Sequence, residues 1–215
     1  MLFHKHKIWF IGVPKTGTTS IHHTWRNKTD RDHDHYRVHD TLNSEDVELI
    51  SSYYQFTIVR NPYDRMVSAC HQHMRDANGD DEKDPNKIIQ YLKGMDNDAL
   101  HRFNEATTPQ YLYLLDKPEE KGGQVAVKNI WRFERLLEQY KLFAYAYNKT
   151  AQFQIPNEML HRNQSTERKK WYQVLNEESI ALVNELYKKD FELFGYDMLD
   201  PAKYTIRESQ ILDVI

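Results

Sequence analysis

The chain is poor in cysteine and contains no long apolar segment. Its single cysteine, Cys70, excludes internal disulfide bonds and a zinc site built from several thiolates. The first seven residues lead directly into the first apolar run, so we expect neither a signal peptide nor a membrane anchor. We therefore expect a soluble, cytoplasmic protein without a membrane anchor.

An excess of positive charge is also missing. The formal net charge of −3 argues against a general nucleic-acid-binding protein, which would be basic overall, so any site for an anion must be local. The 215 residues fit one domain and can bury a substantial core, and no internal repeats are present. We expect residues 1–215 to form a single domain, with a tail at 200–215 whose order the sequence does not indicate.

What the chain does contain, close to its start, is a strand, a tight turn and a helix in direct succession. Ile8–Ile11 is rich in β-branched and aromatic residues and predicts a buried strand. Pro14 and Gly17 interrupt that run, and a helix follows over Ser20–Trp25. Such a unit directs backbone N–H groups and the positive end of a helix dipole at one point, which suits a phosphate-like anion. Lys15 adds a mobile positive charge there.

This turn differs from the Walker A motif, in which the lysine directly follows the second glycine. Here Lys15 precedes Gly17 by two residues, and Thr18 stands where a Walker lysine would be. The string P-K-T-G-T-T after a short strand resembles the 5′-phosphosulfate loop of sulfotransferases that use PAPS (3′-phosphoadenosine 5′-phosphosulfate). The resemblance implies that the following residues bind the nucleotide: Pro14, Lys15, Thr16, Gly17, Thr18, Thr19 and Ser20.

A second motif follows about forty residues later. A predicted strand at Phe56–Val59 ends at Arg60, and Pro62 suits the first position of the next helix. The string V-R-N-P-Y-D-R-x-V-S is similar to the 3′-phosphate-binding segment of the same family, which implies that Arg60 and Ser68 bind that phosphate. The forked, always charged guanidinium suits this task. The structural alternative is that Arg60 merely pairs with Asp64.

Two further strands and two long helices complete the predicted fold. We predict strands at Tyr36–His39 and Val125–Val127, a helix that opens at Asn129 and runs through Tyr140, and a last helix over Asn176–Phe194. Together with the two motifs, this pattern predicts an α/β fold, with a mostly parallel central sheet flanked by helices, similar to P-loop NTPases.

The candidate general base is His39. It ends a predicted strand, where open α/β sheets carry their sites, and a neutral imidazole can accept a proton at neutral pH. His39-Asp40-Thr41 resembles the His-x-Thr sequence found after the second strand in several relatives of the same family. His22, His23 and Glu45 are the reserve candidates. Several histidine pairs occur, but no H-E-x-x-H spacing accompanies them, so we predict no metal site.

Two other segments carry weaker signals. Arg168, Lys169 and Lys170 lie in the one locally basic stretch, which would attract an anionic nucleotide or would simply be a solvated run of charge. Gln110 belongs to a Pro-Gln-x-x-Tyr-Leu-like stretch, and in the family such a stretch lies near the acceptor. The acidic segment 76–87 lacks the ligand spacing of an EF-hand and predicts a solvated loop.

The resemblance implies an enzyme that moves a sulfuryl group from PAPS to an acceptor hydroxyl by direct in-line transfer, without a metal, with Lys15 and His39 as its catalytic residues. A glycan is the expected acceptor. Two other classes stay open. A nucleotide kinase or NTPase would need Mg²⁺ and a Walker-placed lysine. A non-catalytic nucleotide-binding module would keep the loop and lack a base.

Overall fold

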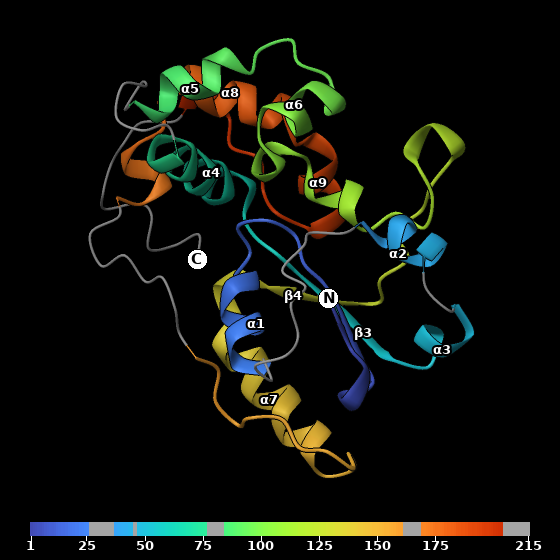
Figure 1. Ribbon diagram of the computed structural model, residues 1–215. Coiled ribbons are helices and arrows are strands. Elements are labelled where there is room, and N and C mark those ends of the chain that lie inside the picture. The colour runs from blue at the N-terminus through green and yellow to red at the C-terminus, as the bar shows by residue number, and fades with distance from the viewer. Residues whose placement is uncertain (26–36, 45–46, 77–83, 161–168, 204–215) are drawn as a thin grey trace. The chain divides into compact units, whose positions relative to one another are not determined.

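A computed structural model describes residues 1–25, 37–44, 47–76, 84–160 and 169–203 (Figure 1). Contacts divide the chain into two compact units, and each of them combines two separate stretches of chain. The first unit comprises Met1–Asn61 and Thr108–Ser165, and the second comprises Pro62–Thr107 and Thr166–Ile215.

A four-stranded sheet forms the centre of the first unit. Its strands are β1 (Leu2–Phe3), β2 (Ile8–Ile11), β3 (Tyr54–Val59) and β4 (Asn129–Arg132), in the spatial order β1-β2-β3-β4. The short β1 is antiparallel to β2, whereas the β2–β3 and β3–β4 pairs are parallel. The predicted α/β class with a mostly parallel sheet is therefore confirmed, as are the strand at Ile8–Ile11 and the one at Phe56–Val59, which begins two residues earlier.

Two of the predicted strands are wrong. Within the predicted strand Tyr36–His39, Val38 and His39 instead begin helix α2 (Val38–Ser44), in which Val38 and Thr41 are buried three residues apart, as on one helix face. Val125 forms only an isolated antiparallel bridge with Leu115. The third strand of the parallel sheet is β4, at the position where the sequence predicted the start of a helix.

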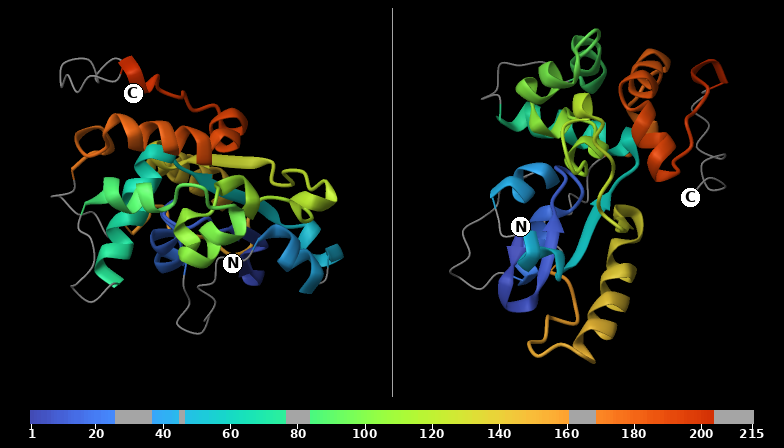
Figure 2. Two further views of the ribbon diagram at one scale, coloured as in Figure 1. Left: turned by 90° about the horizontal axis from the view of Figure 1, so that it is seen from above. Right: turned by 90° about the vertical axis from the view of Figure 1, so that its right-hand side faces the viewer.

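Helices α1 (Thr18–Trp25) and α7 (Leu136–Asn148) pack on one face of the sheet. The 3-10 turn Phe133–Arg135 separates β4 from α7, and α7 then runs back alongside β3 (Figure 2). The shared core consists of apolar side chains from the strands, the two helices and neighbouring segments: Met1, Phe3, Ile8, Phe10, Ile21, Trp25, Phe56, Ile58, Trp131, Leu136, Tyr140, Ala144 and Ile155. On the opposite face, Trp9, Ile11, Thr57 and Val59 are also buried, as is usual for parallel strands. Helix α3 (Val47–Ser51) completes the described helices of this unit.

The second unit is helical. Its helices are α4 (Pro62–Asp76), α5 (Pro85–Tyr91), α6 (Asn97–Phe103), α8 (Glu177–Leu186) and α9 (Lys188–Phe194). Asp84, Asp96 and Asn176 cap three of them, each accepting a hydrogen bond from a backbone N–H of the first turn. The single last helix that the sequence predicted is divided at Tyr187, although its capping by Asn176 and its end at Gly195 are confirmed.

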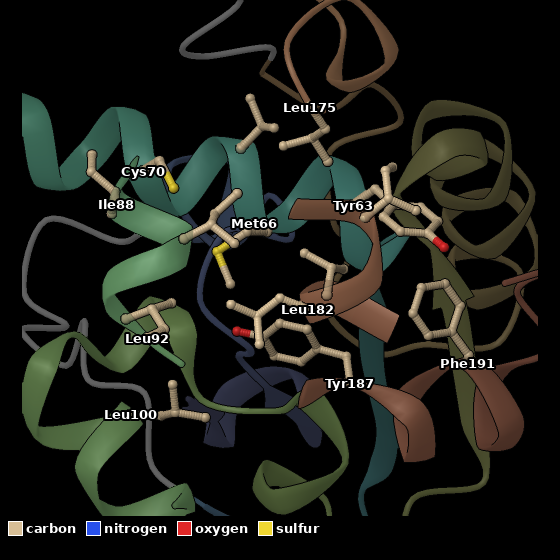
Figure 3. Packing of buried hydrophobic residues seen from close by; sticks show 14 residues of the cluster. Tyr63, Met66, Cys70, Ile88, Leu92, Leu100, Leu175, Leu182, Tyr187 and Phe191 are labelled. Carbon is tan, nitrogen blue, oxygen red and sulfur yellow. The ribbon is translucent and has the colours of Figure 1, made fainter. Parts of the chain in front are cut away.

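Tyrosine, leucine and sulfur-containing side chains fill the core of the second unit (Figure 3). Tyr63, Met66 and Cys70 of α4 pack with Leu182 of α8 and with Tyr187, which lies between α8 and α9. Tyr187 also donates a hydrogen bond of 2.5 Å to the carbonyl of Thr107. The unit therefore has a core of its own, separate from the one on the sheet.

Candidate active site

The turn between β2 and α1 has a left-handed backbone at two places. Lys15 has φ +69° and Gly17 has φ +91°. The carbonyl of Gly17 accepts hydrogen bonds from Ser20 N (3.0 Å) and Ile21 N (3.2 Å), so α1 starts directly after it. The N–H groups of the first residues of a helix have no partner within that helix. Those of Thr18 and Thr19 are accordingly placed to bind an anion at the end of the turn.

Contacts within the first unit hold the turn in this shape. The buried Thr16 hydroxyl donates a hydrogen bond of 2.8 Å to the carbonyl of Val13. A Cβ atom at Gly17 would lie 2.9 Å from Leu136 Cδ2 and 3.3 Å from Phe133 Cε2. Glycine is therefore needed at position 17 both for its φ angle and for the close approach of the segment that begins α7.

The other predicted loop residues differ in exposure. Pro14, Thr18 and Ser20 are buried, whereas Lys15 and Thr19 are partly exposed. The structure thus leaves the side chain of Lys15 at the surface of a turn whose interior is packed, where a charged substrate group can approach it.

Arg60 contacts this turn directly. Its Nη1 donates a hydrogen bond of 2.9 Å to the carbonyl of Lys15. Its guanidinium also lies over the ring of Phe133, 4.2 Å from the ring centroid, at cation–π distance. The segments that follow β2 and β3 therefore meet at one edge of the parallel sheet, where α/β proteins commonly bind ligands.

Side chains far along the sequence hold the main chain beyond β3. Gln110 accepts a hydrogen bond from Arg60 N and donates one to Arg60 O, both 2.9 Å long. Glu134 accepts a hydrogen bond of 2.7 Å from Asn61 N. From the sequence, Gln110 was expected near the acceptor, and its contact with Arg60 was missed. The available signal was a glutamine that follows a proline, and it does not indicate which residue the side chain contacts.

Ser68, Lys169 and Lys170 belong to the second unit. Ser68 lies on α4 and is 4% exposed, while both lysines are exposed. Arg168 lies outside the described residues, as does the reserve base Glu45. The binding roles predicted for these residues stay predictions.

His39 is on α2 and does not end a strand, so the positional argument for it as the base is wrong. Its ring is mostly buried, with 12% of the side chain exposed, and Nε2 lies 3.3 Å from Asp40 Oδ1. Its Nδ1 is buried and has no hydrogen-bond partner among the described residues. The reserve candidates His22 and His23 are on α1, with their ring centroids 5.7 Å apart.

Among the described residues, no group of three histidine, cysteine or acidic side chains could hold a metal ion. In the same part of the chain, no helix has the length and apolar character needed to cross a bilayer.

Comparison with known proteins gives one match. A family model described as "Sulfotransferase family" matches residues 1–197, a range that includes both motifs and extends just past α9. No curated protein and no solved structure matches the chain.

Proposed function

Because this chain belongs to the sulfotransferase family, we propose that it transfers a sulfuryl group from PAPS to an acceptor hydroxyl, and that the acceptor is a carbohydrate. The observation that carries the proposal is the contact between Arg60 and Lys15, which joins the 5′-phosphosulfate-type turn to the 3′-phosphate-type segment.

The residues at the turn fit a nucleotide with two anionic groups. The left-handed Gly17 leaves no Cβ between the turn and α7, and the N–H groups that open α1 at Thr18 follow Lys15 by three residues in the same turn. Arg60 adds a second cation at this point, with the forked geometry that suits a terminal phosphate. We assign the 5′ side to Lys15 and to the amides at Thr16–Thr19, and the 3′-phosphate to Arg60 and Ser68.

When bound, PAPS supplies an activated sulfuryl group and a phosphate leaving group, so the reaction is a direct in-line displacement. Lys15 and the amides of α1 stabilise the negative charge that grows on the departing oxygen, which lowers the barrier more than it strengthens binding. The acceptor hydroxyl loses a proton as the new bond forms, and this proton needs a base close to it.

His39 remains our candidate for that base, now on the strength of its contacts. With a proton on Nε2 facing Asp40, the imidazole has its lone pair on Nδ1, which is buried, so the base role requires that acceptor binding open a path to Nδ1. The carboxylate of Asp40 would keep this tautomer and stabilise the imidazolium that forms. We also retain Lys169 and Lys170 as residues that attract the anionic nucleotide.

Calorimetric titration tests the nucleotide directly. We expect 3′-phosphoadenosine 5′-phosphate to bind the wild-type protein and to bind more tightly than ATP with Mg²⁺. A preference for ATP with Mg²⁺ would instead indicate a kinase or NTPase. If the 3′-phosphorylated nucleotide binds but no sulfuryl group is transferred in the assay described next, the protein is a non-catalytic nucleotide-binding module.

The acceptor is tested separately, by offering radiolabelled PAPS together with glycans, phenols and lipids. We expect label on the glycans. If only phenols or lipids become labelled, the protein is a sulfotransferase but its acceptor is not a carbohydrate.

A further inference from the structure

Gln110 makes an unusual pair of contacts. Its carboxamide is fully buried, at 0% exposure, and it binds both main-chain groups of one residue fifty positions away, Arg60. The side-chain oxygen accepts from Arg60 N and the side-chain nitrogen donates to Arg60 O, each at 2.9 Å. Two opposed hydrogen bonds of this kind fix both the position and the orientation of the backbone at Arg60.

The need for this contact follows from where β3 ends. Val59, opposite Arg132, is the last residue of β3 that pairs with β4, so the main chain of Arg60 lies beyond the ladder. Backbone groups that leave a ladder in a partly buried place need other partners, because leaving them unsatisfied is costly. Gln110 supplies both partners that a neighbouring strand would otherwise provide.

The side chain of Arg60 depends on the placement of its backbone. The guanidinium donates to the carbonyl of Lys15 and lies on the ring of Phe133. Lys15 has a left-handed backbone, at φ +69°, which a lysine adopts only when its surroundings hold it there. Contacts thus run without a gap from Gln110 through Arg60 to the turn at Lys15.

We propose that Gln110 is a positioning residue: it holds Arg60 in place for the 3′-phosphate and, through Arg60, supports the turn at Lys15. The first half of this assignment rests on the function proposed above, whereas the second half concerns the turn alone and is independent of the nucleotide.

A matched control exists in the same unit. Asn148, at the end of α7, clamps Ile155 in the same manner: its Nδ2 donates to Ile155 O and its Oδ1 accepts from Ile155 N, both at 2.8 Å. The test compares Gln110→Met with Asn148→Leu, because each variant removes two hydrogen bonds to one main chain and keeps a side chain of similar size. Asn148→Leu also removes the hydrogen bond of 2.9 Å that Nδ2 donates to Asn157 Oδ1, so it is the more severe of the two losses. If both act only on stability, their effects will be alike.

The first readout is the affinity ratio between 3′-phosphoadenosine 5′-phosphate and adenosine 5′-phosphate, which isolates the contribution of the 3′-phosphate. We expect Gln110→Met to lower this ratio about tenfold relative to wild type, the size of effect of losing one or two hydrogen bonds that fix a binding group. Asn148→Leu should leave the ratio unchanged.

The second readout is hydrogen exchange of the peptide that spans residues 12–18, measured without nucleotide. Gln110→Met should speed exchange there, whereas Asn148→Leu should not. If Gln110→Met fails to fold, Gln110→Glu takes its place. Gln110→Glu keeps the acceptor for Arg60 N, loses the donor to Arg60 O and introduces a carboxylate that competes for the guanidinium. As for Gln110→Met, we expect a lower affinity ratio and faster hydrogen exchange at residues 12–18.

The outcomes separate this inference from the function on which it partly rests. A wild-type protein that does not prefer the 3′-phosphorylated nucleotide overturns the proposed function, and hydrogen exchange then decides alone whether Gln110 supports the turn. A wild-type preference that survives in Gln110→Met, with exchange equal to that of Asn148→Leu, overturns the inference and leaves the function standing.

Discussion

Lys15 and Arg60 are in contact, yet we assign them different parts of the reaction, and single substitutions can separate these parts. Lys15→Ala should lower turnover by about a hundredfold or more, because the lysine acts mainly on the charge of the transition state. Nucleotide affinity should stay within about tenfold, or about 1.4 kcal/mol, of wild type. Arg60→Ala should chiefly weaken the binding of 3′-phosphoadenosine 5′-phosphate. Steady-state kinetics and calorimetry on the same preparations measure both effects.

Arg60→Lys is the control for this comparison, since it keeps the charge and loses the fork that reaches the carbonyl of Lys15. An intermediate affinity is expected. Equal losses of turnover and affinity in the Lys15→Ala and Arg60→Ala variants would argue against separate roles.

His39 is tested by its effect on turnover. His39→Ala should lower turnover across the neutral pH range while nucleotide affinity stays within about tenfold of wild type, because the base acts on the acceptor. His23→Ala, on the partly exposed face of α1, is the comparison variant. Wild-type turnover in His39→Ala would show that the base is another residue, even where the sulfotransferase activity itself survives.

Gly17 and Gly94 make a pair that separates backbone strain from steric overlap. Both have positive φ, +91° and +77°, but a Cβ atom at Gly94 meets nothing within 4 Å, whereas one at Gly17 lies 2.9 Å from Leu136 Cδ2. Gly17→Ala should therefore destabilise the fold by about 1–3 kcal/mol more than Gly94→Ala. Urea denaturation of the two variants measures the difference, and equal losses would mean that the segment at the start of α7 yields without cost.

At the scale of elements, the contact between α1 and α7 closes the core on one face of the sheet. Trp25 Nε1 donates a hydrogen bond of 2.8 Å to the hydroxyl of Tyr140, which in turn donates to the carbonyl of Pro156 at 2.7 Å. One phenol thereby links α1, α7 and the segment after α7. Burial raises the pKa of this phenol to about 12, while the hydrogen bond from Trp25 acts to lower it.

Removal of that hydroxyl should be costly near neutral pH. Tyr140→Phe leaves a buried indole N–H and a carbonyl without their partner, so we expect a loss of about 1–3 kcal/mol in the free energy of unfolding. Tyr145→Phe is the matched control on the same helix, because Tyr145 is 64% exposed. Similar urea midpoints for the two variants would contradict the structural role of the Tyr140 hydroxyl.

The Tyr140 phenol also makes the free energy of unfolding depend on pH. Its pKa in the folded chain, about 12, lies above the ordinary value of 10.0, so the folded state holds the proton more tightly. This contribution to stability is complete below pH 10 and is lost as the pH rises towards 12. The stability gap between wild type and Tyr140→Phe should therefore narrow over that window.

At the scale of the whole molecule, neither compact unit is a continuous stretch of chain. The chain leaves the first unit after Asn61, returns at Thr108 and leaves again after Ser165. Each unit has its own core, one on the sheet and one among the helices. Because neither unit can fold from a single segment, we propose that residues 1–215 unfold as a single cooperative domain.

Cys70 and the tryptophans report on the two units separately. Burial raises the pKa of the Cys70 thiol to about 12 from an ordinary value of 9.0, so the folded second unit should resist thiol reagents near neutral pH. In a Trp171→Phe variant, tryptophan fluorescence comes from Trp9, Trp25 and Trp131, which all lie in the first unit. Urea midpoints from thiol labelling and from fluorescence should coincide. Two separate midpoints would show that the units fold as separate domains.

The sequence alone was sufficient for those parts of the site that depend on local sterics. A left-handed turn needs glycine at position 17, and proline suits the first turn of a helix, so α1 and the start of α4 could be predicted, although α1 begins at Thr18, two residues before the predicted start. The apolar runs of β2 and β3 predicted buried strands in the same way. Parallel strands that end at one edge then indicated that the two motifs lie near each other, whereas the hydrogen bond from Arg60 to the Lys15 carbonyl had no local signal.

Tertiary structure decided the rest, because short segments and distant partners carry no local signal. Val38 begins a helix and Asn129 begins a strand, each against its local pattern, since segments of a few residues take the form that buries their apolar side chains best. Gln110 binds a residue fifty positions away, and no spacing in the sequence predicts that contact. Only the path of the whole chain brings the carboxamide to the end of β3, where the backbone of Arg60 has left its ladder and requires a partner.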